Sequence, residues 1–481
     1  MGLLILLLAG LLAGLAAARY GLLVAVATLA GLAAGAAAFF FPWAGVLAAI
    51  VLAVLLPVGV LPLRSGVTPS LLELTLLGCL GGWLLPPLVR ADRRWRMTWL
   101  DVLVWLLIAL VTFSLTLFWD RGGNANVLNN HLKFVLAMAT FFAVRQLARE
   151  PRRRRQFIAV LLVAAGLAAV VGLVLQALPD STALDALVRL GPLGYPTAGR
   201  VLRYVEDDPA GLERAIGTAV DPNSFGGMLA LVAAVALGEA LAWGERRWPR
   251  LFRTFQGADG GNREEGVAQE SLPFPLLVAL LGVLLLCLYR TYSRAALGGL
   301  AVAALFLVLA RYRRLWWGIL AILVVAATAV AVLGLDHPVV ARYVEGIAFQ
   351  DLSNQMRLDE YADAWAVVQR YPVLGVGFGN APDADLVLGV SSIYLTIAER
   401  MGLVGLAAFL AAVGAAGVHA LRLCRAEPAE AGRRTALLAA VAAALAIGVL
   451  DHYFFNPEFS HMAVLFWATL GLASVELDRQ A

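Results

Sequence analysis

The chain has 481 residues, of which 61% are hydrophobic and only 15% are charged. Soluble domains have about 45–50% apolar and about 25% charged residues, so this composition excludes a string of soluble domains and indicates a polytopic membrane bundle. The formal net charge of +4 is small and does not indicate nucleic-acid binding. No pair of the three cysteines has metal-ligand spacing, so neither a zinc site nor a disulfide framework is expected.

Apolar runs long enough to span a membrane, about 17–25 residues each, recur along the whole chain. The N-terminal run lacks a basic segment in front of it and continues into more apolar sequence, which predicts a first span rather than a cleaved signal peptide. The candidate spans lie near residues 2–17, 21–40, 43–63, 70–89, 100–119, 131–147, 157–178, 224–243, 273–290, 295–310, 315–334, 393–421, 434–451 and 462–476. The predicted fold is all-α, a polytopic helical bundle with about 12–14 transmembrane helices.

Hydropathy divides the chain into five regions. They are N-terminal transmembrane helices (1–178), a long loop (179–223), central transmembrane helices (224–334) with a linker at 245–272, a larger loop (335–392) and C-terminal transmembrane helices (393–481). The linker is rich in glycine and charge, which is typical of flexible segments. In the larger loop, Arg357 to Gln369 predicts an amphipathic helix that ends at Tyr371-Pro372, before a glycine-rich turn.

Arginine-rich loops alternate along the chain with less basic loops. The arginine-rich loops are 90–96, 149–155, 245–253, 311–314 and 422–434. By the positive-inside rule these loops are cytoplasmic and the loops between them lie outside. Both termini are therefore predicted to be cytoplasmic, and both long loops are predicted to lie at the outer face, where loops of this length are usually functional or disordered.

Several arginines nevertheless fall on the predicted outer side, where the same rule depletes them. They are Arg200, Arg203, Arg214, Arg290, Arg294, Arg342, Arg357, Arg370 and Arg400. The guanidinium group is a rigid fork of donors suited to phosphate, so the set favours an anion site. Salt bridges are the alternative explanation, with loop carboxylates at Glu206, Asp207, Asp208, Glu213, Asp359 and Glu360.

The stretch "RAIGTAVDPNSFGG" stands directly before an apolar run. Asp221 is a good N-cap and Pro222 is favoured at the first helical position, so a span should begin here with its N-terminus facing outward. The unpaired N–H groups and positive dipole end of such a helix, together with Arg214, predict an anion cradle. The paired glycines at 226–227 would let another backbone or a ligand approach closely. The alternative is a well-capped span without a ligand.

Two further motifs follow in order. One is "TYSRAALGGL", which opens a later span, and the other is "RLDEYADAWAVVQRYPVLGVGFGN" followed by "SSIYLTIAERMGLVGL". Together with the first stretch, these motifs cover residues 214–405 and resemble those of the O-antigen ligase and O-antigen polymerase superfamily of bacterial envelopes.

This resemblance implies a metal-independent, inverting glycosyltransferase of the bacterial inner membrane with a periplasmic active site. Such an enzyme takes a glycan from undecaprenyl diphosphate and passes it to a hydroxyl of an acceptor glycan or of lipid A–core. Its partners would be this lipid-linked glycan, the acceptor, membrane lipids and other proteins of polysaccharide assembly. No metal, cofactor or nucleic acid is expected.

The site residues follow by position from the same resemblance. Arg214 and Arg294 would act in catalysis by binding and neutralising the diphosphate, since stabilising a leaving phosphate is usually a large catalytic term. Arg290, Arg357 and Asn223 are the further residues expected to bind the diphosphate.

The pattern departs from the family at the acceptor side. Ligases of the family carry a histidine before a Tyr-Leu pair, and it is regarded as the base, but here the two positions read Ser391-Ser392. A serine does not accept a proton as imidazole does. The candidate bases are the carboxylates of Glu360, Asp383, Asp385 and Glu399, whereas His337, His452 and His461 are interpreted as interfacial residues.

The missing histidine and the retained arginines favour a polymerase over a ligase. A lipid or glycan transporter is an alternative from another class, and a scaffold of an envelope-assembly complex is a third. The sequence shows no inverted repeat and has few ionisable residues at mid-membrane depth, and both observations disfavour transport.

Overall fold

The computed structural model of the protein describes residues 22–61, 69–89, 97–117, 119, 123–247, 271–334, 352–379, 383 and 385–477. The candidate span at 2–17, most of the predicted linker, Arg342 and His337 lie outside these residues. Within the described ranges the chain forms helices, turns and loops and no β-strand. The predicted all-α class is confirmed.

Every candidate span after the first coincides with an observed helix. The helices of the first half are α2 (Leu22–Phe40), α3 (Pro42–Leu55), α4 (Leu71–Val89), α5 (Trp99–Thr116), α6 (Ala125–Leu147), α7 (Pro151–Ala177), α8 (Asp180–Val188) and α9 (Pro222–Arg247). Those of the second half are α11 (Phe274–Arg290), α12 (Arg294–Ala310), α13 (Trp316–Leu333), α15 (Leu352–Arg370), α16 (Ile393–Ala426), α17 (Pro428–Ile447) and α18 (Ser460–Ala473). Short 3-10 turns are η2 (Gly191–Leu193), η3 (Val205–Asp207), η4 (Arg313–Leu315), η5 (Tyr453–Phe455) and η6 (Pro457–Phe459).

Five of the described helices, α5, α6, α7, α9 and α16, are long and apolar enough to cross a membrane. This confirms a multi-pass membrane protein, and the larger number of spans expected from the sequence stays a prediction. The helix expected in the larger loop is present as α15, which begins at Leu352 rather than at Arg357 and ends directly before Tyr371-Pro372.

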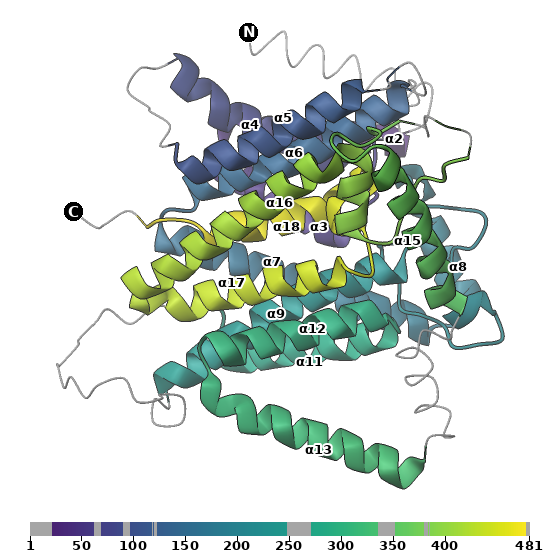
Figure 1. Ribbon diagram of the computed structural model, residues 1–481, viewed down its shortest axis with the longest axis vertical. Coiled ribbons are helices and arrows are strands. Elements are labelled where there is room, and N and C mark those ends of the chain that lie inside the picture. The colour runs from purple at the N-terminus through teal and green to yellow at the C-terminus, as the bar shows by residue number, and fades with distance from the viewer. Residues whose placement is uncertain are drawn as a thin grey trace.

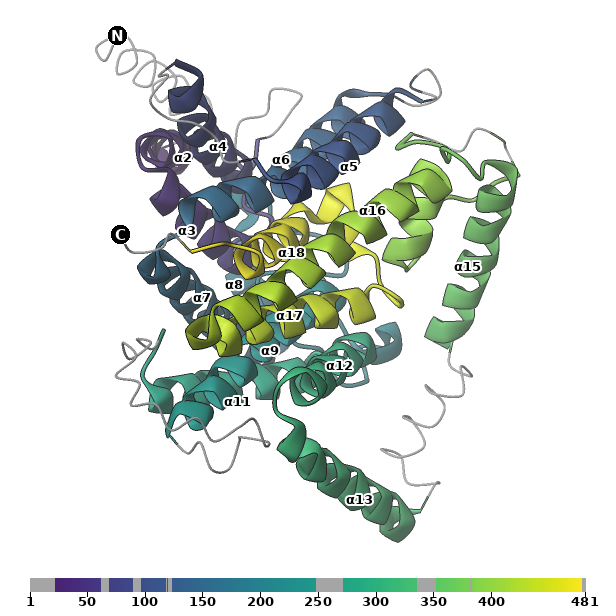
Figure 2. The ribbon, with the colours of Figure 1, turned by 60° about the vertical axis from the view of Figure 1, so that its left-hand side comes forward.

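Helix α9 lies within the bundle and packs against α7, α11, α12 and α17 (Figures 1 and 2). In its most apolar window 83% of the residues are buried. Small residues make the contact with α17 possible, because a Cβ added at Gly238 would lie 2.3 Å from the Cβ of Ala436, and one added at Gly432 would lie 2.7 Å from that of Ala242. Each helix thus carries two small residues at a spacing of four, which lets membrane helices approach closely.

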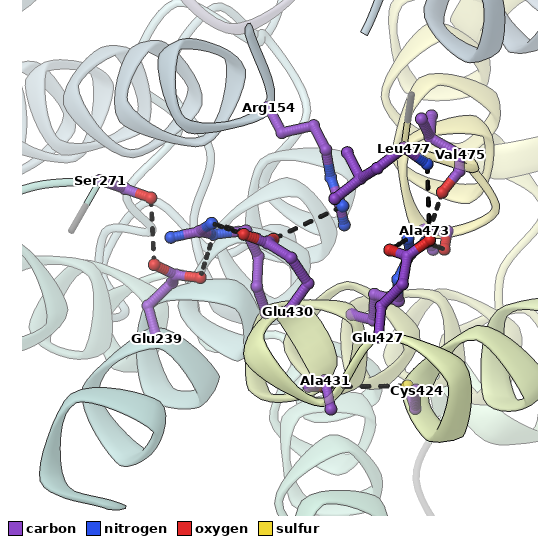
Figure 3. Close-up of polar contacts among 12 residues, drawn as sticks. Arg154, Glu239, Ser271, Cys424, Glu427, Glu430, Ala431, Ala473, Val475 and Leu477 are labelled. Atoms are coloured by element: carbon purple, nitrogen blue, oxygen red, sulfur yellow. Dashed lines mark hydrogen bonds and ion pairs between the residues drawn. The ribbon is translucent and has the colours of Figure 1, made fainter. Parts of the chain in front are cut away.

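A buried ionic cluster joins α7, α9 and α17 at one end of the bundle (Figure 3). Arg433 of α17 donates hydrogen bonds to Glu239 of α9 at 3.1 Å and to Glu430 at 3.0 Å. Arg154 of α7 is fully buried and lies 3.5 Å from Glu430. Because buried charges need partners, these arginines and glutamates fix the three helix ends relative to one another.

A neighbouring arginine extends this cluster to α18. Arg434 is fully buried, pairs with Glu427 and donates to the carbonyl oxygens of Ala473 and Val475 at 3.0 and 2.6 Å. Arg434 and Arg154 come from the arginine-rich loops of the sequence. They are buried structural charges rather than solvated loop residues.

The opposite ends of the same helices carry the long loops. Helix α8 follows the C-terminal end of α7, and α15 reaches the C-terminal end of α17, where the Tyr361 hydroxyl donates to the Val449 carbonyl at 2.6 Å. Figure 1 shows α8 and α15 at the right of the bundle, whereas α13 diverges from α11 and α12 below it. Exposed apolar side chains along α13, with Trp317 73% and Val332 78% exposed, suit contact with lipid.

We predict that Gly238→Ala lowers the thermal unfolding midpoint of the protein in detergent. The added Cβ would lie 2.6 Å from the Cα of Ala436, and overpacking of this kind costs about 1–3 kcal/mol. Gly414→Ala in α16 is the matched control, because a Cβ there meets nothing within 4 Å and alanine favours helix. Equal midpoints for the two variants would contradict the close packing of α9 on α17.

Candidate outer active site

The stretch from Arg214 to Gly227 forms the capped helix start that its residues predict. Helix α9 begins at Pro222, and the Asp221 carboxylate accepts a hydrogen bond from the backbone N–H of Ser224 at 2.6 Å. The remaining N–H groups of the first turn face the end of the bundle that carries the long loops. The N-terminus of α9 therefore presents its positive dipole end at this site.

Arg214 connects this helix start to the turn between α11 and α12. Its Nε donates to the Thr291 carbonyl at 2.8 Å, and a terminal nitrogen donates to the Asn223 side-chain oxygen at 2.6 Å. Helix α12 begins at Arg294, shortly after Thr291, with the Ser293 hydroxyl as its N-cap. The structure thus brings the two arginines expected to bind the diphosphate onto adjoining turns, beside the N-termini of two helices.

The paired glycines permit close contact between protein segments. A Cβ at Gly226 would lie 3.0 Å from Ser293 and from Thr291, so α9 packs directly on the turn before α12. A Cβ at Gly227 would lie 2.3 Å from the hydroxyl oxygen of Tyr453 in η5. The expected close approach is therefore made by two other loops of the same chain, which converge on the start of α9.

Two residues of these turns have strained backbone conformations. Val220, directly before the N-cap, has φ 67°, and Tyr292, in the turn before α12, has φ 52°. Left-handed φ values cost on the order of 1–3 kcal/mol for such residues and persist where surrounding contacts enforce them. Arg214 contacts Thr291, which directly precedes Tyr292, and Asn223, which follows Val220 by three residues.

Arg290 has a different environment from Arg214. Its Nε donates to the Gln176 side chain at 2.8 Å, and its carbonyl accepts from the N–H of Ala215 at 2.9 Å. Arg290 also lies near Glu213, whose pKa is raised to about 7, mainly by burial and by Asp180, while Arg290 opposes the rise. Arg290 therefore fastens the first long loop to the end of α7.

Asp451 is a buried carboxylate in the last turn at this end of the bundle, 7% exposed. Burial, together with the Asp221 carboxylate, raises the pKa of Asp451 to about 7, and Arg357 and Arg214 act in the opposite direction. One carboxylate oxygen of Asp451 has no hydrogen-bond partner among the described residues. Charged residues of α15 and of the loop before α9 therefore lie close enough to Asp451, in the turn after α17, to influence its pKa.

Glu360 and Tyr361 connect α15 to Ser391, the position at which ligases of the family carry a histidine. The Ser391 N–H donates to the Glu360 carboxylate at 2.9 Å, and the Tyr361 hydroxyl donates to the Val449 carbonyl at 2.6 Å. The N–H of Ile393 donates to the Gly448 carbonyl at 2.8 Å. Residues 391–393 therefore lie against the end of α17, immediately before Asp451.

The other candidate bases have partners of their own. Asp383 accepts from Arg370 at 3.0 Å and from the Tyr371 hydroxyl at 2.9 Å, and Asp385 accepts from Arg370 at 3.1 Å. These hydrogen bonds lower the pKa of both aspartates, which weakens them as bases. Glu399 is buried in α16 and pairs with Arg400 at 3.2 Å.

Five arginines of the predicted outer set differ in their environments. Arg200 pairs with Asp207 at 2.6 Å, Arg370 pairs with its two aspartates, and Arg400 donates to the Gly377 and Gly379 carbonyls. For these three the salt-bridge or structural explanation holds. Arg214 and Arg357 instead lie around Asp221 and Asp451, and Arg357 also donates to Asn354 at 3.0 Å.

Sequence reasoning missed the contribution of the last outer turn. Asp451 was not singled out, and His452 was interpreted as interfacial. The available signal was the run "DHYFFNPEFS", which places an acidic residue and a histidine directly after an apolar span. The proximity of Asp451 to Arg214 and Arg357 depends on contacts between segments that are far apart in the chain.

Comparison with known protein families adds a second line of support. Residues 278–410 match the family model described as O-Antigen ligase. This stretch of the chain is similar to the O-antigen ligase family. The predicted resemblance to the O-antigen ligase and polymerase superfamily is confirmed, and with it a glycosyltransferase-like function. No curated protein matches the chain.

The stretch that matches the family model contains only part of the site. Arg294, Arg357 and Glu360 lie within residues 278–410, whereas Arg214 and Asp451 lie outside them. These two residues come from the segments before and after the matched stretch.

We predict that Asp451→Asn gains stability relative to the wild type as the pH rises. The folded pKa of about 7 exceeds the ordinary value of 3.8, so the folded wild type loses stability between pH 4 and pH 7, by up to about 4 kcal/mol for a shift of this size. The asparagine variant lacks this loss. Unfolding midpoints of both proteins at pH 5 and pH 8 measure it, and a difference that does not change with pH would contradict the burial of this carboxylate.

Proposed function

We propose that this protein is an inverting, metal-independent glycosyltransferase that moves a glycan from undecaprenyl diphosphate to an acceptor hydroxyl. The observation that carries the proposal is the contact of Arg214 with the turn that starts α12 at Arg294. This contact brings two arginines together with the N-termini of α9 and α12. Each of these elements favours the binding of an anion. The match of residues 278–410 to the O-antigen ligase family supports the same chemistry.

The reaction requires a good leaving group more than any other feature. The acceptor oxygen forms a bond to the anomeric carbon while the bond to the phosphate oxygen breaks, and the diphosphate leaves with the electron pair. Arg214 and Arg294 would stabilise the charge that develops on this leaving group, which is usually a large catalytic term. Asn223 orients Arg214 through its side-chain oxygen.

Arg357 and Arg290 take different places in this proposal. Arg357 lies with Arg214 near Asp451 and is the third candidate to bind the diphosphate. Arg290 shapes the loop through Gln176 and Ala215, so its contribution to the diphosphate is mainly to hold the Arg214 loop in place.

The distribution of charge supports a periplasmic site in the bacterial inner membrane. The arginine-rich segments at 149–155 and 422–434 meet at one end of the bundle, in the ionic cluster of Figure 3. Arg214, Arg357 and Asp451 meet at the other end. By the positive-inside rule the first end is cytoplasmic, together with both termini.

The favoured reaction is glycan polymerisation, with transfer to lipid A–core as the alternative. Purified protein in detergent or vesicles is given only an undecaprenyl-diphosphate-linked repeat unit. Elongation of this substrate supports a polymerase, and transfer that begins only after a lipid A–core acceptor is added supports a ligase. Movement of the lipid-linked glycan across vesicles without transfer would contradict the proposal and support a transporter.

We predict that Arg214→Gln and Arg294→Gln each lower the transfer rate by about 10²–10³-fold without loss of folded protein. Glutamine keeps a polar side chain but removes the charge that stabilises the leaving diphosphate. Arg200→Gln is the matched control, because Arg200 is an exposed arginine of the same loop that pairs with Asp207. Unchanged rates in both of the first two variants would contradict an anion site at Arg214 and Arg294.

A further inference from the structure

Helix α16 is interrupted at Gly402. This residue has φ 64° and ψ −172°, a backbone conformation that is essentially restricted to glycine. It follows Ile393, the first residue of α16, by about 14 Å along the helix, within a helix that is long and apolar enough to cross a membrane. Such a break leaves backbone groups on both sides without helical partners, and at membrane depth they need partners from the protein.

The loop that follows α15 supplies these partners. Its residues 372–379, which we call the splice segment, exchange backbone hydrogen bonds with α16 on both sides of the break. Before the break, the carbonyls of Glu399 and Arg400 each accept from an N–H of the splice segment at 2.9 Å. After the break, the N–H groups of Leu403 and Val404 donate to two of its carbonyls at 2.8 and 3.3 Å. The splice segment therefore takes the place of the helical turn that α16 lacks.

Glycines allow the backbones to approach this closely. A Cβ added at Gly402 would lie 2.1 Å from the carbonyl oxygen of Val373 in the splice segment. A Cβ added at Gly377 would lie 2.5 Å from the carbonyl oxygen of Ser114, near the end of α5. The splice segment is thus held between α16 and α5.

Arg400 and Glu399 fasten the splice segment with their side chains. The Arg400 guanidinium donates to the carbonyls of Gly377 and Gly379 at 3.2 and 2.9 Å. It also lies 3.2 Å from the Glu399 carboxylate, and the two side chains are only 18% and 1% exposed. Glu399 accepts in addition from the N–H of Gly389 at 3.3 Å. Because charged hydrogen bonds are strong where water is excluded, this pair fixes the loop at two points.

The splice segment in turn holds α15. Its residue Val376 is fully buried in one apolar cluster with Val367 of α15. The same helix carries Arg357, the third candidate to bind the diphosphate, and Glu360, which accepts from the N–H of Ser391. The contacts therefore run from Arg400 through the splice segment and α15 to the candidate site.

We propose that Arg400 is a positioning residue, which holds α15 at the candidate site by fixing the splice segment in the break of α16. This inference rests on the proposed glycosyl transfer. The charge of Arg400 is balanced by Glu399, so Arg400 acts on the reaction through the position of Arg357 and Glu360. The break thus lets a membrane helix determine where an outer helix lies.

The test measures both the position of α15 and the transfer rate in the purified full-length protein. Spin labels are attached in Trp365→Cys on α15 and Leu184→Cys on α8, which replace side chains that are 54% and 38% exposed. Cys424→Ser removes the half-buried native thiol, while Cys79 and Cys287 are buried. The distance between the labels then reports where α15 lies.

Arg400→Gln should shift or broaden the label distance and lower the maximal transfer rate from a lipid-diphosphate-linked glycan by about 10²-fold, since small misplacements of binding groups cost rates of this size. Arg370→Gln is the matched control, because Arg370 ends α15 in an exposed pair with Asp383 and such pairs contribute little. The control should keep the wild-type distance and rate. An unchanged distance in Arg400→Gln, or a changed distance with the wild-type rate, would overturn the proposal.

Two further variants separate positioning from a loss of folding. Arg400→Gln leaves the Glu399 carboxylate buried without its partner, which can prevent folding. Glu399→Gln combined with Arg400→Gln removes both charges and should show the same change in distance and rate. Arg400→Lys keeps the charge without the fork that reaches two carbonyls, so it should restore both only in part. A wild-type distance in the double variant, or full restoration by lysine, would overturn the proposal.

The two measurements keep this inference apart from the proposed function. Absence of transfer in the wild type would contradict the glycosyltransferase, whereas the label distance would still show whether Arg400 fixes α15. Transfer that is lost in Arg214→Gln but kept in Arg400→Gln would overturn only the role of Arg400.

Discussion

The close packing of α9 on α17 is the constraint on which both ends of the bundle depend. With Gly238 against Ala436 and Gly432 against Ala242, the two backbones approach without intervening side chains. At one end this contact sets Glu239 next to Arg433. At the other end it sets the start of α9 beside the loop that follows α17. A change in the distance between the two helices would therefore alter the ionic cluster and the candidate site together.

The two ends use arginine in different ways. In the ionic cluster Arg433 and Arg434 are paired with glutamates and carbonyl groups of neighbouring helices, so their charge is balanced within the protein. At the outer site Arg214 makes its described contacts with a neutral carbonyl and a neutral amide. Burial and the Asp221 carboxylate raise the pKa of the neighbouring Asp451 to about 7.

Much of the fold and about half of the candidate site could be predicted from local sequence. Hydropathy located the helices because each span is a continuous apolar run, and Asp221-Pro222 located the start of α9 because capping depends on adjacent residues. The pairing of Arg214 with the Arg294 turn followed from motif order and sidedness. The contacts of Ser391 with Glu360 and of Tyr361 with Val449 could not be predicted, because they join segments that are distant in sequence.

The same difference between local and long-range contacts explains why some arginines of the predicted anion set have other roles. Arg370 and Arg400 belong to the outer set by position, but their neighbours in space are aspartates and loop carbonyls. Sequence order does not show whether a carboxylate in the same loop will reach a given arginine. Where the pairing is set by a single local motif, as for Asp221 and Ser224, the prediction succeeds.

The left-handed backbone of Val220 and Tyr292 has a consequence for ligand affinity. Both conformations are unfavourable by themselves, so the packing of the folded chain maintains them, and the protein bears this cost when it folds. If this site binds a lipid diphosphate as proposed, the backbone of the Arg214 and Arg294 turns is preorganised before the ligand arrives. Binding would then not spend free energy on ordering these loops, and the site would resist reorganisation as charge moved onto the proposed leaving group.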